Sequence, residues 1–97
     1  MIEIDVNESC MRIKEKMQGA NITPKQLQEA LEVTVTTPYF WLSGKNLPKI
    51  GTLLNIAELL NCKLTDLLIV SGDGVGMRTL EEYYAERVNE EEKTEQE

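Results

Sequence analysis

The chain has 97 residues, 41% of them apolar, and a formal net charge of −7. This length predicts one small domain with an appendage and a modest core. The absence of histidine and the presence of only two cysteines, Cys10 and Cys62, exclude a disulfide framework and a zinc-ligand spacing. No apolar run approaches the ~20 residues that cross a membrane, and the N-terminus has no signal-peptide pattern. We therefore expect a reduced, cytoplasmic protein with no metal site, no cofactor and no membrane partner.

The acidity of the chain belongs to its last part. Residues 1–70 carry seven basic and eight acidic side chains, whereas residues 71–97 carry three basic and nine acidic ones. A nearly neutral first part can still bind phosphates if its lysines share one face. It lacks the strongly basic composition that marks many DNA-binding domains.

An alternation of apolar and acidic residues over 2–6 has the period of two that is typical of a β-strand. A single short strand leaves its backbone amides unpaired and is not stable alone. We expect it to pair with residues 68–70 or with a second chain. Asn7 or Ser9 would then cap a first helix near residues 8–18.

A second helix is predicted to begin at Thr23. Thr23 and Gln26 match a capping box, in which each side chain accepts a hydrogen bond from the backbone amide of the other. Pro24 suits the first helical position, because an amide there would have no partner within the helix.

The start of the third helix is ambiguous because of Pro38. A cap at Thr34 would place the proline where its missing amide loses the first intrahelical hydrogen bond. A cap at Thr37 would leave only residues ~38–43 helical. We favour a late start or a distorted first turn, and we expect Gly44 to end the helix.

Two further helices, a hinge and a tail complete the expected organisation. The helices are predicted at Ile50–Leu60 and Leu64–Ile69 from their apolar patterns. The glycine-rich segment 71–78 is expected to be a hinge. Residues 79–97, which begin with a second capping box, should form an acidic amphipathic helix and then a disordered tail, because the last residues are too charged to fold alone.

Residues 22–68, ITPKQLQEALEVTVTTPYFWLSGKNLPKIGTLLNIAELLNCKLTDLL, resemble the helix-turn-helix core of the phage-repressor-like (XRE, Cro-type) regulators. The resemblance lies in register as well as residue type: Thr23 opens a helix, Trp41 anchors the next, and Gly44-Lys45 ends that one. With the preceding helix it covers roughly residues 8–70.

The resemblance implies an all-α fold, in which residues 1–70 form a five-helix λ-repressor-like helix-turn-helix domain. The short N-terminal strand precedes this domain's helices, and the acidic C-terminal helix follows the hinge. The implied structural core contains Leu27, Leu31, Val33, Trp41, Leu53, Ile56 and Leu67. Glu32 occupies a turn where the family usually has glycine, and a left-handed backbone there would cost roughly 1–2 kcal/mol.

In this family the second helix crosses the DNA backbone and the third enters the major groove. The resemblance therefore implies that base edges are contacted by Val35, Thr36, Tyr39 and Phe40. It implies that phosphates are contacted by Lys25, Lys45 and Asn46. The reading face lacks the Arg, Lys, Asn or Gln that bind guanine or adenine in a bidentate manner, so apolar contacts to thymine methyl groups would carry the specificity.

Two function classes remain. The first is a sequence-specific, repressor-type transcriptional regulator that binds double-stranded DNA, expected to be a homodimer. The alternative is a protein-interaction module on the same fold, which would bind a protein partner through an aromatic patch of Val35, Tyr39 and Phe40 or through the acidic tail. No nucleophile–base constellation occurs in the sequence, so we expect no catalytic residues and no enzyme.

The tail helix has an apolar face formed by Leu80, Tyr83, Tyr84 and Val88. We expect this face to pack on the core or on a second subunit, away from the third helix, because it is too apolar to leave in water. The rarer alternative is that the acidic helix folds over Lys25 and Lys45 and competes with DNA.

Overall fold

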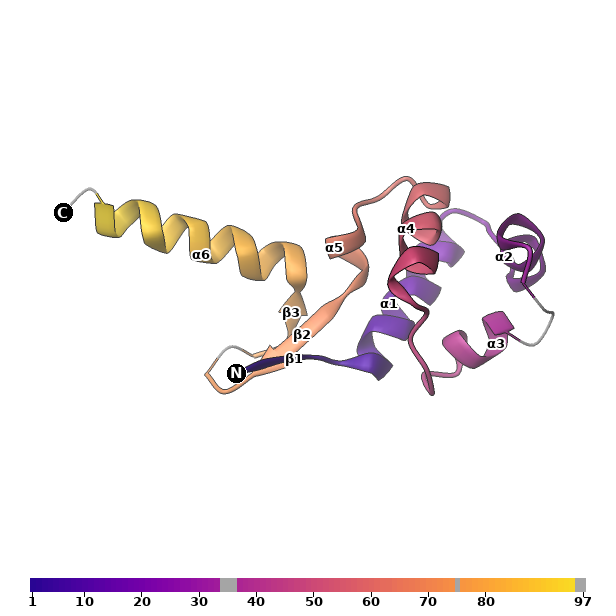
Figure 1. The fold of residues 1–97 in the computed structure, drawn as a ribbon, viewed down its shortest axis with the longest axis horizontal. Helices are drawn as coiled ribbons and strands as arrows, with labels where there is room; N and C mark the ends of the chain where they lie inside the picture. Colours follow the sequence, from indigo (N-terminus) through magenta and orange to yellow (C-terminus); the bar gives the residue numbers. More distant parts are fainter. Residues whose placement is uncertain (34–36, 75, 96–97) are drawn as a thin grey trace.

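The computed structural model describes residues 1–33, 37–74 and 76–95, and for Thr37, Phe40 and residues 88–95 it describes the backbone alone. The described chain forms an elongated molecule with principal extents of 54 × 24 × 22 Å (Figure 1). Its helices are α1 (Val6–Gly19), α2 (Pro24–Leu31), α3 (Thr37–Leu42), α4 (Ile50–Leu59), α5 (Leu64–Leu67) and α6 (Leu80–Glu95). None of these helices is both long and apolar enough to cross a membrane.

A small antiparallel sheet pairs the segment before α1 with the segment between α5 and α6. Its strands β1 (Ile2–Ile4), β2 (Ile69–Gly72) and β3 (Arg78–Thr79) lie in the order β1-β2-β3. The expected pairing of the N-terminal strand within the chain is confirmed, since Ile4 lies opposite Val70. The purely all-α description is wrong, because the glycine-rich segment expected to be a hinge contains the end of β2 and the beginning of β3.

Helix α1 begins earlier than expected, because its cap is Asp5 rather than Asn7 or Ser9. The Oδ1 atom of Asp5 accepts a hydrogen bond from the backbone N–H of Glu8 at 3.0 Å. Ser9 is buried and has a different function: its Oγ accepts from the backbone N–H of Ile69 at 2.8 Å. The side chain of Ser9 therefore ties α1 to the first residue of β2.

The hydrophobic core lies among the first five helices. Its buried members include five residues that were expected there: Leu27, Trp41, Leu53, Ile56 and Leu67. Leu31 and Val33, which were also expected in the core, are partly exposed and pack against it. Complete burial of one such aliphatic side chain contributes about 1.5–3 kcal/mol, so this cluster is the main source of stability.

Helix α6 is attached to the body through its first turn. The backbone N–H of Leu80 donates to the carbonyl oxygen of Leu68 at 2.8 Å, and the Leu80 side chain packs against the core. Thr79 caps the helix as expected, since its Oγ1 accepts from the backbone N–H of Glu82 at 3.1 Å.

Beyond this first turn, α6 projects from the body at the end opposite to α2 and α3 (Figure 1). It continues to Glu95, so most of the segment expected to be a disordered tail is helical. The physical reason is that glutamate and lysine favour helix and that the anchored first turn has already met the cost of nucleation. Tyr84, expected on a packed face, is 54% exposed.

Candidate nucleic-acid interface

The start of α2 is fixed by local hydrogen bonds. Thr23 Oγ1 accepts from the backbone N–H of Gln26 at 3.2 Å, and Gln26 Oε1 accepts from the backbone N–H of Thr23 at 2.9 Å. Pro24 occupies the first helical position. This capping box confirms the expected helix start and leaves Lys25 exposed at it.

The turn after α2 is held by a left-handed residue. Glu32 has φ 55° and ψ 39°, and its backbone N–H donates to the carbonyl oxygen of Gln28. Val33 donates to the same oxygen at 3.3 Å. A residue with a Cβ costs roughly 1–2 kcal/mol in this conformation, so Glu32 carries the expected strain.

Helix α3 presents one side chain clearly to solvent and buries two others. Tyr39 is 59% exposed, whereas Trp41 is 8% exposed and Pro38 is fully buried. The bounds Thr37–Leu42 agree with a late helix start. A proline fits the first turn of this helix, because the amide that it lacks would have no intrahelical partner there.

Some of the residues with a predicted DNA contact lie outside this description. Residues 34–36, including Val35 and Thr36, are outside the described residues, and so is the side chain of Phe40. Their contacts with base edges remain predictions. Tyr39 is the predicted reading residue whose side-chain position is known, and it faces solvent.

The chain after α3 is fixed against α1. Gly44 has φ +83°, and a Cβ atom built on it would lie 3.1 Å from Oδ1 of Asn7. The Sγ of Cys10 donates to the carbonyl oxygen of Asn46 at 3.5 Å. The close approach of Gly44 to Asn7 and the Cys10 hydrogen bond position the backbone at Lys45 and Asn46, whose side chains are exposed.

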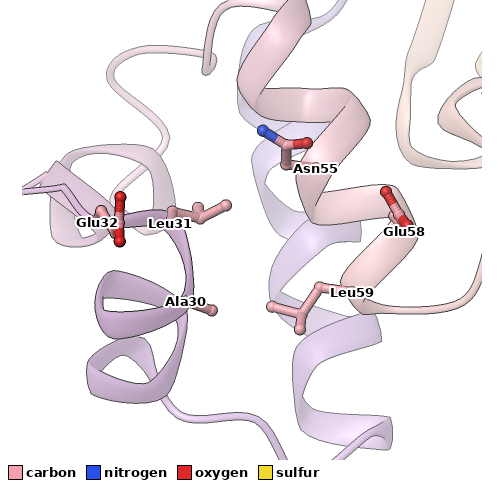
Figure 2. A pocket seen from close by; sticks show the side chains of 6 residues that line it. All are labelled: Ala30, Leu31, Glu32, Asn55, Glu58 and Leu59. Carbon is pink, nitrogen blue, oxygen red and sulfur yellow. The ribbon is translucent and has the colours of Figure 1, made fainter.

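An acidic groove of about 640 Å³ lies between the end of α2 and α4 (Figure 2). Leu31 and Leu59 point toward each other across it, and the carboxylates of Glu32 and Glu58 lie at its border. Two negative charges at this border disfavour an approaching phosphate. The charge of this groove therefore does not favour phosphate binding.

A second groove, of about 300 Å³, lies between α1 and the end of α3. It is lined by Asn7, Met11, Lys14, Glu15, Gln18, Leu42, Ser43 and Gly44. The sequence predicted no shared site for these residues, because their proximity depends on two helices that are far apart in the sequence. The only local signal is that Met11, Lys14 and Gln18 recur at helical spacing on one face.

Two other cations of α1 are already paired. Arg12 Nη2 and Lys16 Nζ lie 2.9 and 3.1 Å from the carboxylate oxygens of Asp66 on α5. Desolvation, the largest single influence, would raise the pKa of Asp66. The hydrogen bonds and charges of Arg12 and Lys16 together outweigh it and lower that pKa.

The ion pairs near α5 show which lysines already have an acidic partner within the described part of the chain. Lys63 Nζ lies 3.1 Å from Glu81 Oε1 in the first turn of α6. Thr65 Oγ1 donates to Glu81 at 2.6 Å, and this bond is the first cause of a lowered Glu81 pKa. Within the described part of the chain, Lys14, Lys25 and Lys45 form no ion pair.

Comparison with known protein families shows a match between residues 12–73 and the Cro/C1-type HTH DNA-binding domain. The matched segment begins within α1 and ends just after β2, so it includes α2, the turn and α3. No curated protein and no solved structure matches the chain.

Proposed function

The chain belongs to the Cro/C1-type HTH DNA-binding domain family, and from this membership we propose that it is a repressor-type transcriptional regulator that recognises a specific double-stranded DNA sequence. The observation that carries the proposal is the exposure of Tyr39 on α3, with exposed lysines at the start of α2 and directly after α3. In this arrangement α3 enters the major groove and α2 crosses the backbone.

The charges near α3 support this docking face. The segment Thr37–Leu42 contains no acidic residue, so α3 itself does not repel the phosphates. Lys25 and Lys45 would neutralise phosphates on either side of the groove and release counterions. Tyr39 would contact thymine methyl groups or sugars, together with Phe40 and the residues before the helix.

We propose further that the protein binds as a homodimer. A single short reading helix with apolar side chains gives limited discrimination. Two copies bound to half-sites about 34–36 Å apart would double the number of base contacts and match a two-fold symmetric operator.

The test is a binding titration of the full-length chain on duplexes selected from a random pool. Lys25→Ala and Lys45→Ala should weaken binding to all sequences alike and lower the slope of log K against log salt by about 1 each. Tyr39→Ala should change the preferred sequence. Lys63→Ala is the matched control, since Lys63 is already paired with Glu81.

Two results would contradict this proposal. One is the absence of any DNA binding by the unmodified chain at about 50 mM salt, where phosphate contacts are strong. The other is binding that none of the lysine and tyrosine substitutions changes. The first result would favour the protein-interaction module, for which Tyr39 of the aromatic patch and Tyr84 of the acidic helix, both more than half exposed, are the side chains to test. The second result would overturn the assigned docking face.

A further inference from the structure

We propose that Lys14 on α1 binds a phosphate of the DNA backbone, in the groove between α1 and the end of α3. This inference rests on the proposed DNA-binding function and extends its interface to a helix that lies outside the helix-turn-helix unit. The occupant of the groove is the sugar–phosphate backbone of the same duplex that α3 reads.

The position of the groove supports this assignment. Ser43 follows Tyr39 by four residues, so the two share a face of the helical turn that ends α3. Ser43 lines the groove together with Lys14, and Tyr39 is exposed. The groove therefore borders the solvent-facing side of α3, and a duplex held against that side continues across the groove.

The groove has fixed walls. On the α1 side, Ile13 and Met17 are buried in the core and hold the helix in place. On the α3 side, Gly44 lies close to Asn7, since a Cβ built on it would be 3.1 Å from Oδ1 of Asn7, and the carbonyl oxygen of Asn46 accepts a hydrogen bond from Cys10. The backbone at Lys14 is therefore held in place relative to the backbone at Lys45, and the two exposed lysines would contact one DNA backbone at separate phosphates.

The chemistry of the lining fits a phosphate. Lys14 is exposed and forms no ion pair with any described residue, whereas Lys16 on the same helix is bound to Asp66. The side-chain amides of Asn7 and Gln18 can donate to phosphate oxygens, as amide groups commonly do at protein–DNA interfaces. Glu15 lines the same groove and opposes this binding, which makes it a useful counter-test.

The experiment measures binding of the full chain to a fluorescein-labelled duplex selected from a random pool, and to a scrambled duplex, between 50 and 200 mM salt. Lys14→Ala should weaken both complexes and lower the salt slope by about 0.9, the value for one phosphate. The ratio of the affinity of the unmodified chain to that of Lys14→Ala should consequently fall about 3.5-fold between 50 and 200 mM salt. Lys14→Arg should retain the slope, since it keeps the charge.

Two further variants separate a phosphate contact from a general charge effect. Glu15→Gln should strengthen binding to both duplexes, because it removes a carboxylate from the groove. Lys63→Ala removes the same charge as Lys14→Ala at a site near α6 and should leave the slope unchanged. Circular dichroism of Lys14→Ala should match that of the unmodified chain, because the side chain is exposed.

The outcomes distinguish this inference from the proposed function. If the unmodified chain binds and Lys25→Ala weakens it, but Lys14→Ala behaves as Lys63→Ala does, the phosphate contact at Lys14 is wrong and the proposed function stands. If the unmodified chain binds neither duplex, both are wrong. A change in sequence preference in Lys14→Ala would also overturn the inference, because a phosphate contact affects all sequences alike.

Discussion

Replacement of Glu32 by glycine should stabilise the protein. Glu32 has φ 55°, a conformation that costs roughly 1–2 kcal/mol for a residue with a Cβ. Glycine avoids this cost but loses about 0.5–1 kcal/mol more backbone entropy on folding. The net expectation is a gain of roughly 0.5–1 kcal/mol, which for a chain of this size raises Tm by roughly 2–8 °C.

The assay is urea unfolding followed by the fluorescence of Trp41, the single tryptophan, which lies on the helix that follows the turn. Asn61→Gly is the matched control: Asn61 has φ 54°, and asparagine already tolerates this region, so little gain is expected. Glu32→Gln removes the negative charge, which lies across the groove from Glu58, and keeps the backbone strain. An equal gain in Glu32→Gln and Glu32→Gly would refute the backbone argument, and so would a Glu32→Gly protein no more stable than the original.

Three further predictions concern stability. Trp41→Ala should cost roughly 3–5 kcal/mol in urea melts followed by circular dichroism, and a loss under about 1 kcal/mol would show that Trp41 is not a core residue. Because the pKa of Asp66 is lowered in the folded protein, its carboxylate stabilises the fold above the ordinary aspartate range and loses this effect as pH falls through the folded value. Asp66→Asn should therefore be less stable than the original at neutral pH, by about 1 kcal/mol or less, and the difference should vanish in acid; a constant difference would contradict this. Deleting residues 77–97 removes β3, Leu80 and the Glu81 contacts and should lower Tm, while unchanged stability would mean that α6 is a free appendage.

Features that depend on neighbouring residues were predictable from the sequence. The capping box at Thr23 and the cap at Thr79 involve atoms three residues apart, so residue type and spacing suffice to predict them. The left-handed conformation at Glu32 was suggested by the resembled family, which usually has glycine in this turn. The burial of Trp41 followed from the register of the resembled family.

Features decided by distant residues were not predictable in the same way. Ser9 is a good capping residue by type, but a hydrogen bond to Ile69, sixty positions away, takes its side chain and leaves the cap to Asp5. The glycine-rich segment has the composition of a hinge, and the pairing of β2 with both β1 and β3 makes it a hairpin.

The same limit applies to the candidate site. The sequence shows seven basic residues before residue 71 but not which of them are engaged. The structure pairs Lys16 with Asp66 and Lys63 with Glu81. It leaves Lys14 beside the end of α3. Which cations remain for a phosphate is a property of the folded chain, since it depends on where the acidic partners of α5 and α6 lie.

The separation of charge along the molecule suggests that the acidic helix orients the protein on DNA rather than competing with DNA. The first turn of helix α6 is held by contacts of Leu80 and Glu81, and the helix projects from the end opposite to α2 and α3 (Figure 1). Within one chain, α6 could reach Lys25 and Lys45 only if the contacts of Leu80 and Glu81 were broken. Held where it is, its negative charge lies far from the phosphates that the lysine-bearing end would contact. If the end that carries α6 approached the DNA first, its negative charge would be repelled by the phosphates. The charge distribution therefore favours the orientation in which α3 meets the duplex.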